Sequence, residues 1–282
     1  MNEITIPYPK DSRFLEFLYH TVPGRFLLKG LIFPGLSEFC GKFLDSSLSK
    51  IFIPHFVRKN GIRLSDYQDC DYRSFNDFFS RSIRPELRPV DSDPEHLIAP
   101  CDGLLSAYRI TESFVIPVKQ RYYTIDDLLE DPLLAAGYRN GTCLVFRLCV
   151  NHYHRYCYVD SGLKEKNTHI PGVLHTVRPV ALGSVPVFSQ NAREYTLIDS
   201  ASFGPVVQME VGALLVGKIE NYHEACRVQR GQEKGRFLYG GSTIILLLKN
   251  NTVCFPEWVF DAAKNSCEIP VKMGEMIAKK AD

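Results

Sequence analysis

The chain has 282 residues, and its 33 basic and 32 acidic side chains leave a net charge of +1. This length supports one or two domains with a core large enough to fold without disulfides or metal. Ordinary hydrophobic and charged fractions exclude wholesale disorder, and the charge balance argues against a general nucleic-acid binder, which needs a basic surplus. The nine cysteines are scattered without a Cys-x-x-Cys pair, which favours a reducing compartment over a disulfide framework or a zinc site.

The charge is unevenly distributed along the chain. Residues 13–63 hold eight basic and three acidic side chains, a net charge of +5, which leaves −4 for the remainder. The segment is rich in large apolar residues but has no run of about 18, the length that crosses a bilayer. We expect short amphipathic helices broken at Pro23-Gly24 and Pro34-Gly35. They either lie in the headgroups of an anionic membrane or pack on the rest of the protein, and composition alone favours packing.

Beyond this segment the pattern changes to strands. Ser74 and Thr124, each with an aspartate three residues later, are typical of helix N-caps. Apolar, β-branched or alternating runs predict strands at 142–150, 194–198, 206–219, 243–248 and 252–255. We therefore predict an α+β fold, with N-terminal helices in residues 1–63 and a β-rich, flattened-barrel or sandwich-like body in residues 64–282. The strand that follows Ser242 should be central to the sheet.

The sharpest local feature is the sequence Gly240-Gly241-Ser242 before a buried strand. Two glycines permit a tight backbone, and the following strand would hold the serine in place. The serine hydroxyl is within reach of the preceding carbonyl, that of Gly241, so an N→O acyl shift is conceivable. Elimination from the resulting ester would break the chain and leave a dehydroalanine that hydrolyses to a pyruvoyl group. Taken alone, the same pattern is usually a loop that enters a strand.

Three other features offer candidate site residues. Asp102 precedes a glycine, as in an Asx-turn or as in a carboxylate that orients a histidine. His152 and His154 would share one face of a strand, as a general base or as metal ligands, and no third ligand stands out in the sequence. Arg193 could hold a carboxylate or phosphate, or form an ordinary pair with Glu194.

Seven stretches occur together and in order, and with them the chain resembles the phosphatidylserine decarboxylase proenzymes, in the bacterial branch with a Gly-Gly-Ser-Thr cleavage motif. The stretches begin at Ser74 (SFNDFFSRSIRPELRP), Pro100 (PCDG), Tyr153 (YHR), Asn191 (NARE), Val211 (VGALLVG), Lys234 (KGRF) and Gly240 (GGST). The resemblance covers about residues 71–248.

The resemblance implies that Asp102, a histidine and Ser242 form a relay that cleaves the chain between Gly241 and Ser242. The products would be a beta chain, residues 1–241, and an alpha chain, residues 242–282, which stay associated. Ser242 would become a pyruvoyl group that forms a Schiff base with the amine of phosphatidylserine. Loss of CO2 then gives phosphatidylethanolamine, without a metal or an external cofactor.

This chain departs from the family at two positions of the Asp-Tyr-His-Arg-x-His pattern. His152 stands where the aspartate is common, and Cys157 stands where the second histidine is common. We assign the base to His154, with His169 and His175 as possible substitutes. Cys157 is a poor base if buried, because an apolar setting raises a thiol pKa. Candidate substrate-binding residues are Arg193, Arg155 and His169.

Because the implied substrate is a lipid, we expect the +5 segment of residues 13–63 to dock on a membrane that contains phosphatidylserine. The expected location is peripheral, on the cytoplasmic side of the cell membrane, and a homodimer remains open. Three other functions also remain open. They are a pyruvoyl decarboxylase of a soluble amino-acid derivative, a serine hydrolase that uses Asp102, His154 and Ser242, and an uncleaved lipid-binding homologue.

Overall fold

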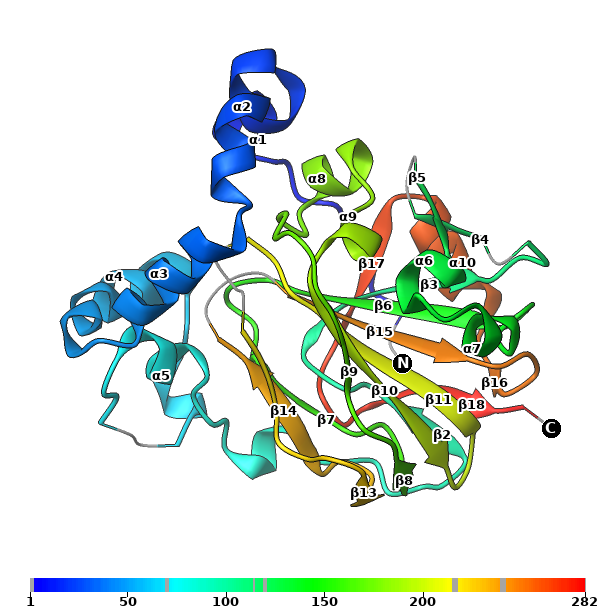
Figure 1. Ribbon diagram of the computed structural model, residues 1–282. Coiled ribbons are helices and arrows are strands. Elements are labelled where there is room, and N and C mark those ends of the chain that lie inside the picture. Colours follow the sequence, from blue (N-terminus) through cyan, green and yellow to red (C-terminus); the bar gives the residue numbers. More distant parts are fainter. Residues whose placement is uncertain are drawn as a thin grey trace.

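The computed structural model describes residues 3–68, 71–113, 115–118, 121–214, 218–238 and 242–281. Helices dominate the N-terminal part and strands the rest, so the predicted α+β class is confirmed (Figure 1). The helices of the N-terminal part are α1 (Arg13–His20), α2 (Val22–Leu31), α3 (Pro34–Leu44), α4 (Ile53–Asn60) and α5 (Phe75–Phe79). Later helices are α6 (Ile125–Leu129), α7 (Pro132–Ala136), α8 (Pro179–Ser184), α9 (Val187–Gln190) and α10 (Glu257–Lys264).

Local sequence signals set several helix boundaries. The Ser74 hydroxyl accepts a hydrogen bond from the backbone N–H of Asp77, and Thr124 does the same for Asp127, so both predicted N-caps are confirmed. Pro23 and Pro34 lie in the first turns of α2 and α3, where the missing proline N–H costs no helical hydrogen bond. The two Pro-Gly pairs therefore lie at the starts of helices, and the predicted breaks fall just before them, at Thr21 and at residues 32–33.

The body is built around one ten-stranded antiparallel sheet. Its strand order is β1-β17-β3-β6-β15-β11-β10-β8-β13, with β9 also paired to β10. The bounds are β1 (Ile6–Pro7), β17 (Cys267–Val271), β3 (Gly103–Arg109), β6 (Thr142–Leu148), β15 (Ser242–Leu248), β11 (Gly204–Val211), β10 (Arg193–Ser200), β8 (Gly162–Lys164), β13 (Cys226–Val228) and β9 (Thr168–Ile170). The order forms an open path, which fits a sandwich-like body and not a closed barrel. As predicted, β15 is central.

Smaller sheets and helices cover the main sheet. One three-stranded sheet consists of β12 (Ile219–Asn221), β14 (Glu233–Phe237) and β7 (Arg155–Cys157). Another consists of β16 (Val253–Cys254), β18 (Met276–Lys280) and β2 (His96–Ile98), and β4 (Val115–Val118) pairs with β5 (Arg121–Thr124). Because successive strand residues face opposite sides, β15 contributes to two cores. Ile244 packs in a core with Tyr156 and Phe237, and Ile245 packs in another with Leu129 and Tyr138.

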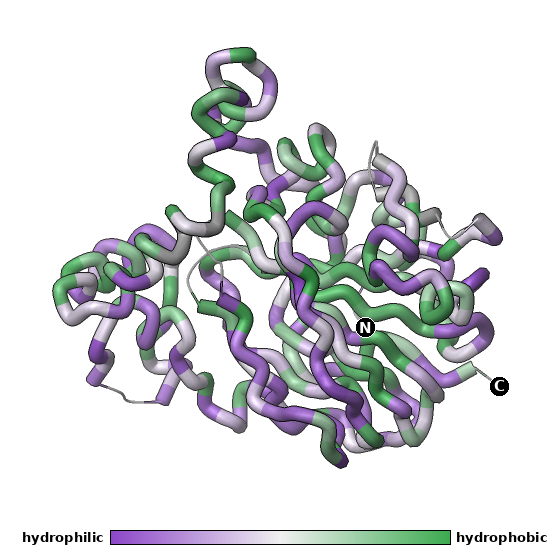
Figure 2. Tube along the Cα trace, in the orientation of Figure 1, coloured by the Kyte–Doolittle hydropathy of each residue, from purple (hydrophilic) through white to green (hydrophobic). Residues whose placement is uncertain are grey.

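The N-terminal helices are anchored at two places and exposed elsewhere. Leu18, Tyr19 and Leu28 belong to the main core, while Phe56 of α4 packs edge-on against Phe75 of α5. Outward-facing large apolar side chains remain on α1 to α3, at the start of α3 and on the turn before α4: Phe14, Phe17, Val22, Phe26, Leu27, Phe33, Phe39, Phe43, Leu48, Ile51 and Phe52. Figure 1 shows these helices projecting from the β body, and Figure 2 shows hydrophobic stretches along them. Within the described part of the chain, no helix has the length and apolar character to span a bilayer.

Candidate active site

The predicted site residues gather at one end of the main sheet. Leu104 of β3 lies opposite Arg147 of β6, and Ser242 of β15 lies opposite Leu148. The start of β3, the end of β6 and the start of β15 therefore meet at the same edge. Asp102 immediately precedes β3, and His154 follows the turn after β6. The carbonyl of His154 accepts a hydrogen bond of 2.9 Å from the backbone N–H of Phe237, at the end of the strand that leads towards Ser242.

Ser242 is fully buried at the first position of β15. Its hydroxyl has no hydrogen-bond partner among the described residues, and the same holds for Thr243 on the opposite face of the strand. Buried polar groups are nearly always hydrogen-bonded, so such an atom needs a functional or structural explanation. Gly241, the other half of the predicted cleavage site, lies outside the described residues.

Asp102 is bound by an arginine and a backbone amide. The Arg88 guanidinium donates to both carboxylate oxygens, at 2.6 Å to Oδ1, and the backbone N–H of Met273 also donates to Oδ1 at 3.0 Å. Burial alone would lower the pKa of Arg88, but its hydrogen bonds to Asp102 and the carboxylate charge outweigh burial and raise it. The partners that the structure gives Asp102 are thus Arg88 and Met273, and contact of Asp102 with a histidine stays a prediction.

His154 is fully buried, and its ring packs on Phe79 with the two ring centroids 4.1 Å apart. Its Nδ1 lies 2.9 Å from the backbone carbonyl oxygen of His152. A carbonyl oxygen can only accept, so Nδ1 carries the proton and Nε2 is the acceptor nitrogen of the neutral ring. This is the tautomer that a general base needs at Nε2, which supports the choice of His154.

The alternative bases differ in protonation and exposure. Burial raises the pKa of the Cys157 thiol to about 12, so Cys157 is neutral and weakly basic near pH 7. Burial lowers the pKa of His175 to about 4, and its Nδ1 lies 3.0 Å from the hydroxyl of Tyr19 on α1. His169 lies on the exposed strand β9, and its nearest carboxylate oxygen, on Glu194, is 4.0 Å away.

The two arginines predicted to bind substrate are already engaged. Arg193 is 1% exposed, and its five N–H donors reach the carbonyls of Leu128, Ser189, Asn191 and Asp127 and the carboxylate of Glu130. The Arg155 side chain donates to the carbonyl of Ser80 and pairs with Glu233 at 2.8 Å. Arg193 has no donor left for a substrate carboxylate or phosphate.

A buried charge cluster near the site was not anticipated from the sequence. Glu210 and Lys234 are both fully buried, with Glu210 Oε2 and Lys234 Nζ 2.6 Å apart. Asn221 accepts from Lys234 at 2.7 Å and donates to Glu194 at 2.6 Å. Since Glu210 lies opposite Ile244, it shares the sheet face of Ser242. The sequence signal was weak, because Glu210 follows Gln208 as a second polar residue of its strand and Lys234 lies in a short polar strand.

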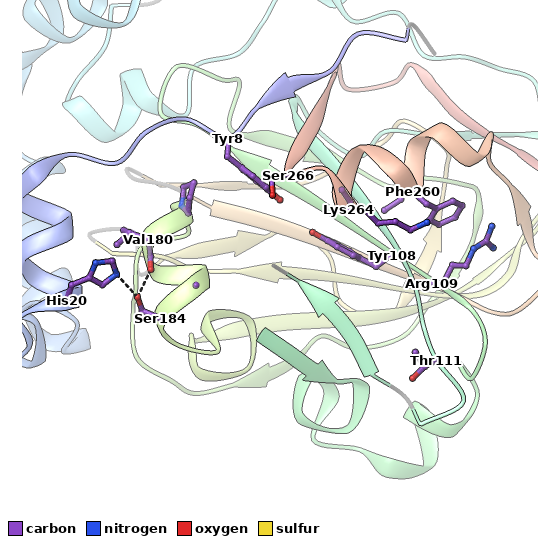
Figure 3. Close-up of a pocket in the computed structure, with 14 residues that line it drawn as sticks. Tyr8, His20, Tyr108, Arg109, Thr111, Val180, Ser184, Phe260, Lys264 and Ser266 are labelled. Atoms are coloured by element: carbon purple, nitrogen blue, oxygen red, sulfur yellow. Dashed lines mark hydrogen bonds between the residues drawn. The ribbon is translucent and has the colours of Figure 1, made fainter. Parts of the chain in front are cut away.

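A cavity of about 950 Å³ lies elsewhere (Figure 3). Its wall includes Tyr8, Val180 of α8, Phe260 of α10, and Tyr108 and Arg109 of β3. Arg109 is seven residues from Asp102, which corresponds to roughly 20 Å along an extended strand. Of its described lining residues, none is a predicted relay residue. The part of the chain that the structure describes also holds no group of three or more His, Cys, Asp or Glu side chains suited to a metal ion.

Comparison with known proteins identifies the family. A family model described as phosphatidylserine decarboxylase matches residues 75–279. Phosphatidylserine decarboxylase proenzyme 2 of Clostridium acetobutylicum is 41% identical over 95% of this chain and 92% of its own length. The phosphatidylserine decarboxylase proenzyme of Clostridium perfringens is 38% identical over 95% of this chain and 93% of its own length. The chain therefore belongs to the phosphatidylserine decarboxylase family of enzymes.

Proposed function

We propose that the chain is a proenzyme that cleaves itself between Gly241 and Ser242 and then decarboxylates phosphatidylserine to phosphatidylethanolamine. The observation that carries the proposal is the Ser242 hydroxyl. It is buried, has no hydrogen-bond partner in the described part of the chain, and lies at the sheet end that also holds Asp102 and His154. An oxygen in this state suits an atom that is transferred from the serine to the Gly241 carboxylate during maturation, so the residue fits a pyruvoyl precursor.

The chain's own residues account for the cleavage. His154 Nε2 takes the proton of the Ser242 hydroxyl, and Oγ attacks the Gly241 carbonyl carbon. The peptide C–N bond breaks as the Ser242 nitrogen receives that proton, which leaves an ester. Loss of the Ser242 α-proton then breaks the bond between Cβ and Oγ and releases the carboxylate of Gly241. Water hydrolyses the resulting dehydroalanine, through its imine form, to the pyruvoyl group and ammonia.

In the mature enzyme, the pyruvoyl carbonyl would bind the substrate amine and accept the electrons left as CO2 departs. His154, whose Nδ1–H bonds to a backbone carbonyl, would take a proton from a reacting atom at the unprotonated Nε2 and then return it. Arg88 forms an ion pair with Asp102 at the same sheet end, and this pair neutralises the charge of the carboxylate. The burial of Ser242 supports a site from which bulk water is kept away.

The two fragments should remain together after cleavage. All seven residues of β15 are buried, and the strand is hydrogen-bonded to β6 and β11 on its two sides. Both neighbours lie in residues 1–241, so removal of residues 242–282 would open the main sheet at its centre. This packing supports a stable complex of alpha and beta chains.

The surface of the projecting helices supports the proposal that the substrate lies in a membrane. They combine exposed phenylalanines with exposed basic residues, among them Lys29, Lys42 and Lys50. Apolar side chains flanked by cations favour the headgroup region of an anionic leaflet, and phosphatidylserine is anionic. We propose peripheral binding at the cytoplasmic side of the cell membrane, in line with the many cysteines of the chain.

A decarboxylation assay tests the proposal. The purified protein should release CO2 from phosphatidylserine in vesicles, and Ser242→Ala should abolish release. Ser106→Ala, which makes the same change at another buried serine of the main sheet, should keep activity. Faster turnover of soluble phosphoserine without lipid would favour a soluble substrate instead. Ester hydrolysis by an intact chain would favour a serine hydrolase, and an intact, inactive chain a lipid-binding homologue.

A further inference from the structure

The turn between β6 and β7 is held by the side chain of His152. The His152 Nδ1 accepts a hydrogen bond of 3.1 Å from the backbone N–H of Cys149. In return, the backbone N–H of His152 donates to the carbonyl of Cys149 at 2.9 Å. These two bonds close the turn on itself, so the orientation of the peptide that follows His152 depends on the imidazole.

The first of these bonds fixes the tautomer of His152. A backbone N–H can only donate, so Nδ1 must be unprotonated and the neutral ring carries its proton on Nε2. Burial, and then the charges of Arg147 and Arg88, lower the pKa of His152 to about 4, against the opposing effect of Asp102. The ring is therefore neutral near pH 7, and it has no basic nitrogen left to act as the relay base.

The carbonyl at the end of this turn fixes the tautomer of His154. It accepts the Nδ1–H of His154 at 2.9 Å, as described above. In a Ser-His-Asp relay a carboxylate does this work, by holding Nδ1–H so that Nε2 stays the acceptor. Here Asp102 is bound by Arg88 and Met273, while a backbone carbonyl holds Nδ1–H.

We propose that His152 is a positioning residue, which pins the Cys149–His152 turn so that its carbonyl holds His154 in the tautomer with a basic Nε2. The proposal rests on the proposed function, since it assigns His154 as the base of self-cleavage. His152 thus acts on His154 through the backbone of the turn, and it is not itself the base. Asp102 pairs with Arg88 at the same sheet end, so in this proposal the carbonyl of His152 takes the part of the relay carboxylate.

Two substitutions at residue 152 distinguish a positioning role of His152 from a general contribution to folding. Asn offers a side-chain carbonyl oxygen near the place of Nδ1, so His152→Asn can still accept the Cys149 N–H. His152→Ala removes the acceptor. We expect His152→Asn to cleave within about threefold of wild type. We expect His152→Ala to slow cleavage by about 100-fold, the lower end of what a general base contributes. Equal slowing in both variants would overturn the proposal.

A measurement without activity keeps the test independent of the proposed function. In the uncleavable Ser242→Ala chain, 15N NMR of the histidine rings at pH 7 should show His152 protonated at Nε2 and His154 protonated at Nδ1. Ser242→Ala/His152→Ala should lose the pure Nδ1–H form of His154, and Ser242→Ala/His152→Asn should retain it. The opposite tautomers in the Ser242→Ala chain, or an unchanged His154 signal in its His152→Ala variant, would overturn the proposal even if that variant folds poorly. A wild-type chain that never cleaves would instead refute the proposed function. The tautomers in the Ser242→Ala chain would still test whether His152 positions His154.

Discussion

The Asp102 carboxylate depends on a countercharge that is distant from it along the chain. Arg88 lies fourteen residues away in the Pro-Glu-Leu-Arg-Pro stretch, and the pairing arises from how residues 85–102 fold around the start of β3. The sequence identifies Asp102 and Ser242 through short local motifs, but it shows neither the Arg88 partner nor the four carbonyls that surround Arg193.

Removing Arg88 should destabilise the chain strongly. Arg88→Met would leave the Asp102 carboxylate, 8% exposed, without its countercharge. Breaking a buried pair on one side typically costs 3–5 kcal/mol, and we expect about 3 kcal/mol here because Met273 N–H remains. Urea unfolding of the Ser242→Ala chain measures it. Arg109→Met, which breaks the exposed pair with Glu257, is the control and should cost under about 1 kcal/mol. Equal effects of the two changes would contradict this account of Asp102.

The lowered pKa values of His152 and His175 predict a loss of stability between about pH 6.5 and 4. The pKa values of His152 and His175 are about 4 in the folded chain, below the ordinary value of 6.5. The unfolded chain therefore binds more protons in this window, and the free energy of unfolding falls as the pH falls. At pH 4 the loss reaches about 3 kcal/mol for His152, at 1.36 kcal/mol per pKa unit.

The measurement is urea unfolding of the Ser242→Ala chain at several pH values. The His152→Asn/His175→Asn variant should show a clearly smaller decline over the same window. An unfolding free energy that stays constant from pH 6.5 to 4, or an equal slope in the variant, would show that the two rings are not held neutral by the fold.

At the scale of elements, the sequence predicts where helices begin and which strand is central, because caps, prolines and apolar runs act locally. It does not predict which small strands cover the sheet. The β12–β14–β7 layer is fixed by contacts across long separations, such as Lys234 with Glu210, and polar strands of three to five residues carry little periodic signal. Helix α10 was also missed, since it begins at Glu257, after Pro256, without a side-chain cap.

The ion pair between Lys234 of β14 and Glu210 of β11 joins the small β12–β14–β7 sheet to the main sheet, next to β15. Lys234→Met should destabilise the Ser242→Ala chain by about 3–5 kcal/mol, because it leaves a buried carboxylate unpaired. Adding Glu210→Gln should restore most of the loss, since an amide carries no charge to bury. Thermal or urea unfolding of the single and double variants checks the pair. A double variant less stable than Lys234→Met would contradict an unpaired charge as the cause.

At the scale of the whole molecule, the exposed apolar helices and the basic residues lie in one N-terminal segment. Reversing Lys29, Lys42 and Lys50 to glutamate should reduce flotation with vesicles that contain phosphatidylserine. Each cation near an anionic surface contributes about 1 kcal/mol, so losing three should weaken binding at least 100-fold. Reversing Lys166, Lys272 and Lys279, exposed residues of the β body, changes the net charge equally and should have little effect. Equal losses in both variants, or flotation that ignores phosphatidylserine content, would contradict docking through the helices.

The proposed function requires the chain to cut itself before Ser242 and to convert that residue. Intact-mass analysis of the purified, denatured protein detects both changes. We expect two fragments, residues 1–241 and 242–282, with the smaller one lighter than its unmodified sequence by the change from an N-terminal serine to a pyruvoyl group. Ser242→Ala should give a single full-length chain. A wild-type chain that stays at full length, or a smaller fragment with an ordinary serine amine, would refute self-cleavage at this serine.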